Sequence, residues 1–406
     1  MHSDPNILIS GALFIGLALE RRGTALSTKL AEDLLHLLEE YYFDLNTDIA
    51  IYNSVLNAFA KAAKDTSDAR SCFAYAQKAD DLVCKLVEKD RVESDTAPRP
   101  NEYSFLMAIN AWSNAATAAA STGNVSDGRS AALKAEELLK KLQSQPLKTS
   151  KSTIACFGAV IRIWASLGEA EQAQRVLENM VEKSERLPLD IIHFNAVFDA
   201  WARTLISQTD TDKAISRLLN IRDLLMKMNL GGGYDSFNVD PDTSSFNQVI
   251  RACYSPWGST LAMDDENIRY KAFAIAYECY AKMIQDNNRS RRPDAHTYAH
   301  MFKAISTLLP SSTTENRSEK NDVCKTVFHA CCRDGHLSKS SIWTLRKCFP
   351  DGDEFIALLL SELDNHGTMS TKEKLLMISE DQLLAYLPME WSRNGRNYKG
   401  LNRHRQ

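Results

Sequence analysis

Amide side chains with hydrogen-bonding capacity stand directly after the aromatic residue of a recurring phrase at three places in this 406-residue chain. These residues are Asn53, Asn195 and Asn247. An amide both donates and accepts hydrogen bonds, whereas a carboxylate only accepts, so such groups suit the recognition of polar ligands. Three further segments of similar sequence hold residues without hydrogen-bonding side chains at the same position: Leu106, Gly158 and Ala299.

Catalytic and cofactor-binding motifs are missing from the sequence. The glycine run 231–233 lacks the following Lys-Ser/Thr of a phosphate-binding loop. The paired His-x-Glu and Pro-Cys-x-x-Cys motifs of zinc deaminases are absent. One group of possible zinc ligands lacks a paired Cys-x-x-Cys, so helix packing is the preferred interpretation: Cys324, His329, Cys331, Cys332 and His336. We therefore expect no enzyme, no cofactor, no metal and no small-molecule substrate.

The amides belong to a phrase that occurs six times, in which a polar or turn-forming residue precedes an aromatic by four positions. The aromatics are spaced by 53, 52, 37, 52 and 52 residues. An internal repeat of this kind indicates modules that bury their apolar faces only against their neighbours. The six copies are Asp48/Tyr52, Asn101/Phe105, Thr153/Phe157, Asp190/Phe194, Asp242/Phe246 and Asp294/Tyr298.

Each phrase predicts the first helix of a helix pair, because the apolar residues three, four and seven positions after the aromatic share one helix face. Trp112, Trp164 and Trp201 recur along these helices and are expected in the core. Second helices are predicted at 74–87, 131–142, 169–181, 214–228 and 272–284. Insertions in the longer units are expected as loops at 65–71, 115–130, 231–238 and 256–267.

The pattern divides the chain into four parts. Residues 1–48 are expected to be N-terminal capping helices or a partial repeat, and 49–309 to be about six repeats, most with insertions. Residues 310–386 are expected to cap the array, and 387–406 to be a basic flexible tail. The Asp residues that open the phrases also stand where helix N-caps belong, so a purely structural role is an alternative to binding.

Composition favours a helical chain without a membrane span. It is 44% hydrophobic and 25% charged, with only 16 Gly and 11 Pro. The apolar stretch 7–19 is too short for a span and lacks the basic start of a signal peptide, so we interpret it as the first helix. Nine scattered cysteines, an odd number, indicate a reducing compartment. The net charge of −4 counts modestly against a dedicated nucleic-acid binder.

The repeated phrase closely resembles the pentatricopeptide repeat and matches the related tetratricopeptide signature poorly. Its best copies are 241–247, 293–298 and 193–201, and the resemblance spans roughly 47–309, about two-thirds of the chain. The expanded units and the closing phrase 387–394 look like algal members of the family. The resemblance implies an all-α fold, a right-handed α-solenoid of stacked helix-turn-helix repeats.

The family resemblance also implies single-stranded RNA binding with one base per repeat. The base-selecting pair would be the residue after the aromatic and the last residue of the same unit. Asn/Asp pairs would favour uracil and an Asn/Asn pair cytosine, which gives a pyrimidine-biased preference of low specificity. Carried onto this chain, the pairs are Asn53 with Asn101, Asn195 with Asp242, and Asn247 with Asp294, while Tyr103 and Ile192 would sandwich bases.

From this resemblance we expect an RNA-binding protein of the mitochondrion or plastid that acts in RNA processing, stability or translation. No targeting peptide can be read in the sequence. The alternative is a protein–protein interaction scaffold that binds a partner along the concave surface of a helical array. The low net charge and the three positions without a selecting side chain favour the scaffold, whereas the in-phase amide pairs favour RNA.

Overall fold

The structure, a computed structural model, describes residues 29, 33, 36, 49–92, 98–145, 150–182, 189–203, 211–228, 239–255, 266–286, 288–311, 313–349, 351–365 and 380–394. Within these residues it contains α-helices and short 3-10 helices and no strand. The expectation of an all-α chain is confirmed. No helix among the described residues is long and apolar enough to cross a membrane.

The chain divides into two compact units, Met1–Ala200 and Trp201–Gln406. The first unit contains α3 (Ile49–Asp65), α4 (Ala69–Val92), α5 (Glu102–Ser121), α6 (Val125–Ser144), α7 (Lys151–Ser166), α8 (Ala170–Glu182) and most of α9 (Ile191–Arg203). The second contains α10 (Thr211–Lys227), α11 (Thr243–Tyr254), α12 (Glu266–Gln285), η2 (Arg289–Arg291), α13 (Ala295–Leu308), α14 (Thr314–Arg333), α15 (Lys339–Arg346), α16 (Gly352–Asn365), α18 (Glu380–Tyr386) and η3 (Met389–Ser392).

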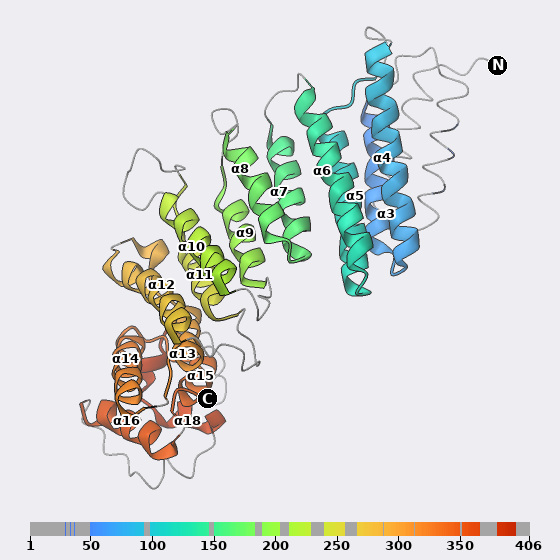
Figure 1. The fold of residues 1–406 in the computed structure, drawn as a ribbon. Helices are drawn as coiled ribbons and strands as arrows, with labels where there is room; N and C mark the ends of the chain where they lie inside the picture. The colour runs from blue at the N-terminus through green and yellow to red at the C-terminus, as the bar shows by residue number, and fades with distance from the viewer. Residues whose placement is uncertain are drawn as a thin grey trace, which may run out of the picture. The chain divides into compact units, whose positions relative to one another are not determined.

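Helices in the first unit pack in two ways at once (Figure 1). The first helix of each pair packs on the helix that follows it, as in the pairs α3–α4, α5–α6 and α7–α8. It also packs on the first helix of the next pair, so that α5 contacts both α3 and α7. The apolar faces predicted by the repeated phrase are buried by this double contact.

The second unit repeats this packing. Helix α11 contacts α12 and also α13, and α13 in turn contacts α14 and α15. Beyond α13, the 3-10 helix η3 packs on α14, and α18 packs on α15. The expected helical pairs therefore occur within each unit.

In three copies of the phrase, the polar residue that opens it is the N-cap at the start of the first helix. Asn101, Asp242 and Asp294 cap α5, α11 and α13, and each forms a capping box with the residue three positions later. A capping side chain satisfies a backbone N–H that has no partner within the helix, typically worth about 1 kcal/mol. The structural role considered for Asp242 and Asp294 is thus confirmed, while Asp48 lies outside the described residues.

The tryptophans are in the core, as expected, and two of them donate to buried acids. Trp112 and Trp164 are 3% and 1% exposed. The Trp112 indole N–H donates to Asp80 Oδ2 at 3.1 Å, and that of Trp164 to Glu136 Oε2 at 3.3 Å. The acids lie on α4 and α6, so each bond joins a first helix to the second helix of the preceding pair. Hydrogen bonds to charged groups stabilise by about 1.5–3 kcal/mol.

Three of the predicted loops are wrong in whole or in part. Residues 115–130 do not form a loop, because the alanine-rich sequence continues α5 to Ser121 and α6 begins at Val125; Gly123, with φ 73°, allows the short turn. Helix α7 begins at Lys151, two residues before Thr153, with Ser150 as its N-cap. Residues 69–71 of the expected loop 65–71 already belong to α4, and 266–267 of the loop 256–267 to α12. The loop 231–238 and residues 256–265 lie outside the described residues.

The segment 387–394 is also not the flexible tail that we expected. It contains η3, and Trp391 is 1% exposed, with its ring edge-on to Phe328 at 5.9 Å. The Leu337 N–H donates to the Trp391 carbonyl at 2.7 Å. Burial of this large aromatic ring outweighs the effect of the neighbouring basic residues. Residues 395–406 lie outside the described part of the chain, as do 1–48 apart from three isolated helical residues.

Candidate nucleic-acid interface

One predicted base-selecting pair links two consecutive first helices in the first unit. Asn53 lies on α3 with 9% of its surface exposed, and its Nδ2 donates to Asn101 Oδ1, the cap of α5, at 3.3 Å. Ser104 Oγ donates to Asn53 Oδ1 at 2.6 Å. We call Asn53, Asn101 and Ser104 the first junction. Both ends of the Asn53 amide are hydrogen-bonded within it.

The second unit contains the same arrangement between α11 and α13. Asn247 is 9% exposed, and its Nδ2 donates to Asp294 Oδ1 at 3.1 Å. Thr297 donates to that same oxygen twice, from its backbone N–H at 2.8 Å and its hydroxyl at 3.0 Å. We call Asn247, Asp294 and Thr297 the second junction. Among the described residues, the buried Asn247 Oδ1 has no hydrogen-bond partner.

Hydrogen bonding at the second junction favours the charged form of its carboxylate. Burial acts to raise the pKa of Asp294, but the Thr297 backbone N–H, the Asn247 amide and the Thr297 hydroxyl all donate to the carboxylate. Together these bonds lower the pKa below its ordinary value of 3.8. The junction therefore holds a fixed negative charge at neutral pH.

The third predicted pair is divided between the two units. Asn195 lies half-buried on α9 in the first unit, and Asp242 caps α11 in the second. Each of these two residues is therefore described within its own unit and not in relation to the other. Asp242 Oδ1 accepts from the Ser245 backbone N–H at 2.8 Å, which is the same capping geometry as at the second junction.

The two predicted stacking residues are on the surface. Tyr103 is 37% exposed and Ile192 is 58% exposed. They occupy the same position, two residues after Asn101 and Asp190, near the starts of α5 and α9. The phrase aromatics two positions further on, Phe105 and Phe194, are fully buried. A planar ring and a branched apolar side chain are thus presented beside the capping residues.

In the copy of the phrase that contains Gly158, a side chain of the next first helix fills the space beside the glycine. A Cβ atom at Gly158 would lie 2.8 Å from His193 Nε2, so the imidazole of His193 occupies the space beside this glycine. His193 is 6% exposed, and burial lowers its pKa. The Gly158 position therefore packs a ring of α9 instead of presenting a polar group.

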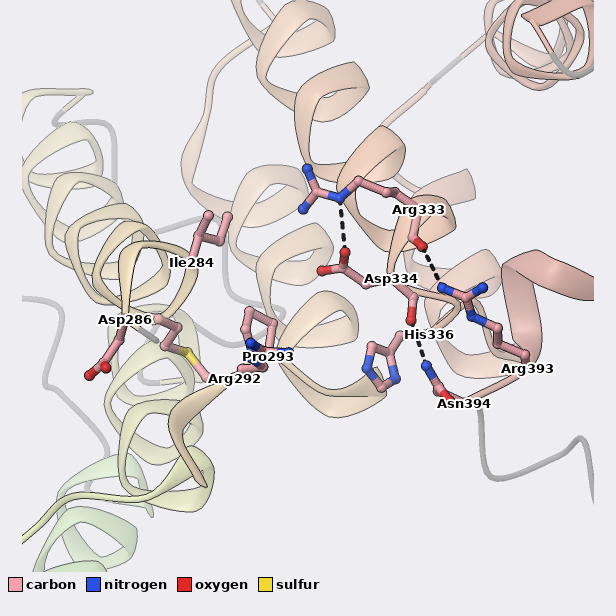
Figure 2. A pocket seen from close by; sticks show the side chains of 10 residues that line it. Ile284, Asp286, Arg292, Pro293, Arg333, Asp334, His336, Arg393 and Asn394 are labelled. Atoms are coloured by element: carbon pink, nitrogen blue, oxygen red, sulfur yellow. Dashed lines mark hydrogen bonds and ion pairs between the residues drawn. The ribbon is translucent and has the colours of Figure 1, made fainter. Parts of the chain in front are cut away.

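A cavity of about 610 Å³ lies in the second unit (Figure 2); of its lining residues, only His336 was singled out from the sequence, as a possible zinc ligand. One group of its residues comes from α12 and the turn before α13: Met283, Ile284, Asp286, Arg292 and Pro293. The other comes from the end of α14, the following turn and the segment after η3: Arg333, Asp334, His336, Arg393 and Asn394. The second group is assembled because 387–394 packs against the end of α14, which composition alone did not predict.

The predicted site residues thus form two hydrogen-bonded junctions, two separate residues and two exposed apolar side chains. Amides and carboxylates in this arrangement can accept from or donate to a polar ligand, and none is placed for proton transfer or nucleophilic attack. No model of a known protein family matches the chain, and no curated protein matches it.

Proposed function

We propose that this chain is a helical-repeat protein that binds single-stranded RNA along its first helices. The main supporting observation is that the two junctions have the same geometry. In each, an amide side chain on one first helix donates to the N-cap residue of the next first helix. A polymer with a regular backbone repeat suits a protein surface whose polar groups recur once per helix pair. The proposal includes the right-handed solenoid expected from the pentatricopeptide resemblance and a role in organellar RNA metabolism.

Two exposed side chains near the starts of first helices support base stacking. Tyr103 and Ile192 stand two residues after the polar residue that opens their phrase and offer apolar surface to solvent. Stacking of a base on an aromatic ring contributes about 1–3 kcal/mol and tolerates any base. The junctions would then supply the limited sequence preference, which we expect to favour pyrimidines.

A specific observation favours the scaffold alternative. Asn101, Asp242 and Asp294 are already used as N-caps, so their presence at regular intervals is explained without a ligand. The carboxylates would also repel phosphate, and the net charge of the chain is −4. A protein partner bound along the first helices would not suffer this repulsion.

Titration of the full chain with pyrimidine-rich and purine-rich single-stranded RNA, at two salt concentrations, tests the proposal. We expect binding that weakens with salt and is tighter for the pyrimidine strand. Substitution of Asn53 or Asn247 by Leu should reduce the pyrimidine preference. No binding at the lower salt concentration would contradict the RNA proposal and favour the scaffold.

Asn114→Leu is a matched control. The Asn114 amide on α5 donates to the Ala60 carbonyl on α3 at 3.0 Å, so it links the same two helices as Asn53 and Asn101 do. Its loss should destabilise the packing without touching the junction. An equal change in RNA preference in Asn53→Leu and Asn114→Leu would show that the effect is structural.

A further inference from the structure

The cavity of the second unit has walls of different character (Figure 2). Ile284, which is 44% exposed, and Pro293 provide an apolar side, and Met283 is fully buried. Arg292 stands beside Pro293, and the other side is lined by Arg333, His336, Arg393 and Asn394. The volume of about 610 Å³ falls in the range of small-molecule sites, about 300–1,000 Å³. The space therefore suits a ligand with one planar apolar part and one polar part.

The two aspartates of the cavity are already neutralised. Asp286 Oδ2 is 2.8 Å from Arg291 Nη1, and its Oδ1 accepts from the Asn288 N–H at 2.9 Å. Asp334 binds Arg333 Nε at 2.9 Å and also accepts from the Tyr298 hydroxyl at 2.6 Å. These bonds leave the carboxylates little capacity for a cationic ligand.

Two of the cavity arginines lack a carboxylate partner. Within the described part of the chain, neither Arg292 nor Arg393 forms an ion pair, although both line the cavity. Arg393 Nη2 donates only to the Arg333 carbonyl, at 3.1 Å. Guanidinium groups bind phosphate oxygens through paired, charge-assisted hydrogen bonds. The cavity thus has a net positive character on a chain whose overall charge is negative.

His336 adds an unused polar atom to the cationic side. Its ring stacks on Tyr298, with centroids 6.0 Å apart and planes 29° apart. Its Nδ1 is buried and has no hydrogen-bond partner among the described residues. Burial lowers the pKa of His336, which favours the neutral ring.

Gly335 allows the segment that contains Arg393 to pack closely against the turn after α14. Gly335 has φ 72°, and a Cβ atom there would lie 2.5 Å from Arg393 Cγ and 2.9 Å from the Glu390 carbonyl oxygen. The Asn394 amide donates to the Asp334 carbonyl at 2.8 Å. The Arg393 and Asn394 side chains are therefore positioned before any ligand arrives, which lowers the entropy cost of binding.

We propose that this cavity binds a nucleoside monophosphate group, with the phosphate at Arg292 and Arg393 and the base against Ile284 and Pro293. The cavity adjoins the second junction, because Pro293 directly precedes Asp294, but its binding residues are different ones, and the proposal goes beyond the binding of an RNA strand along the first helices. Two sources share this chemistry, a free mononucleotide and the phosphorylated end of an RNA strand.

Calorimetric titration of the full chain with uridine monophosphate and with uridine tests the phosphate contact. We expect the monophosphate to bind at least about tenfold more tightly, as for the gain of one charge-assisted interaction. Arg292→Gln and Arg393→Gln should each remove most of this advantage. Arg289→Gln, an exposed arginine of the same turn that does not line the cavity, should leave it unchanged.

Gly335→Ala provides an independent test that changes no charge. It should displace Arg393 and weaken monophosphate binding, while Arg292→Gln covers the case in which the alanine variant does not fold. Equal affinity for uridine and its monophosphate would overturn the proposal. The same would follow from no binding of either, or from equal weakening by Arg289→Gln and Arg393→Gln.

A further titration distinguishes the two sources. A short oligoribonucleotide with a 5′-phosphate that competes with uridine monophosphate, while its 5′-hydroxyl form does not, would assign the site to a strand end. Competition by neither form, with the monophosphate still bound, would assign it to a free nucleotide. Because this result does not depend on Asn53 or Asn247, failure of the RNA proposal leaves the cavity test intact.

Discussion

The two junctions have the same architecture but differ in which acceptor their hydroxyl group uses. At the first junction the cap is a neutral amide, and the Ser104 hydroxyl lies closer to Asn53 Oδ1, at 2.6 Å, than to the cap oxygen Asn101 Oδ1, at 3.1 Å. At the second junction the cap is a carboxylate, and Thr297 donates to Asp294 Oδ1 at 3.0 Å. The hydroxyl has one proton, so the charged cap takes it and leaves Asn247 Oδ1 without a donor.

This difference shows that a change of the cap from an amide to a carboxylate alters which oxygen atoms of the junction receive a hydrogen bond. The first junction is complete within the protein. The second contains an unused acceptor, which costs about 1–3 kcal/mol when buried without a partner.

The largest expected effect comes from removal of the caps. Asp294→Ala should lower the free energy of unfolding by about 3 kcal/mol, because the cap is lost and both ends of the Asn247 amide are then unpaired. Asn101→Ala should cost about 1–2 kcal/mol, since Asn53 keeps its bond from Ser104. Denaturant unfolding of both variants measures the difference. Equal losses would show that the orphaned oxygen is irrelevant to stability.

Removal of the amides should reverse this order. Asn53→Leu breaks a complete set of bonds and should cost about 2 kcal/mol. Asn247→Leu also deletes the oxygen that has no partner, so its cost should stay within about 1 kcal/mol. Thermal unfolding at one protein concentration compares them, with Asn114→Leu as the reference for an ordinary helix–helix bond. A larger loss for Asn247→Leu would contradict the assignment of donors.

The smallest expected effect is a dependence on pH that only the second junction shows. The pKa of Asp294 is lowered in the folded chain, so its stabilisation is complete above the ordinary value of 3.8 and is lost as the pH falls through the folded value. The difference in unfolding free energy between the wild type and Asp294→Asn should therefore shift against the wild type on acidification below about pH 4. A difference that stays constant or moves the other way would indicate that Asp294 is not the titrating group.

The sequence predicted the helical pairs and their buried residues because these depend on local periodicity. Burial of Phe105 and Trp112, and the capping of α13 by Asp294, follow from side-chain spacing within a single helix. Thr153 shows where spacing fails: the aromatic of that copy stands one turn deeper in α7, because Ser150 caps the helix earlier. Any of several nearby polar residues can act as the N-cap, and the position of the cap can change while the apolar face of the helix stays the same.

Contacts between distant residues could not be predicted in this way. The bonds that link the two helices at each junction join residues about fifty positions apart, and the choice of donor depends on distances that only the packed helices define. The cavity depends on the packing of Trp391 near Phe328 and on the close approach of Gly335 to Arg393. A composition rich in basic residues predicted solvent exposure for that segment, whereas one aromatic side chain determined its place.

The tryptophan–acid bonds restrict how helix pairs of this protein can be exchanged or recombined. Trp112 and Asp80, like Trp164 and Glu136, belong to different pairs. A transplanted pair that brings the tryptophan without the acid, or the reverse, would leave a polar group buried without its partner. A recombined array should therefore be divided within the helix pairs and not between them. The segment to exchange then consists of the second helix of one pair and the first helix of the next, so that each acid stays with its tryptophan.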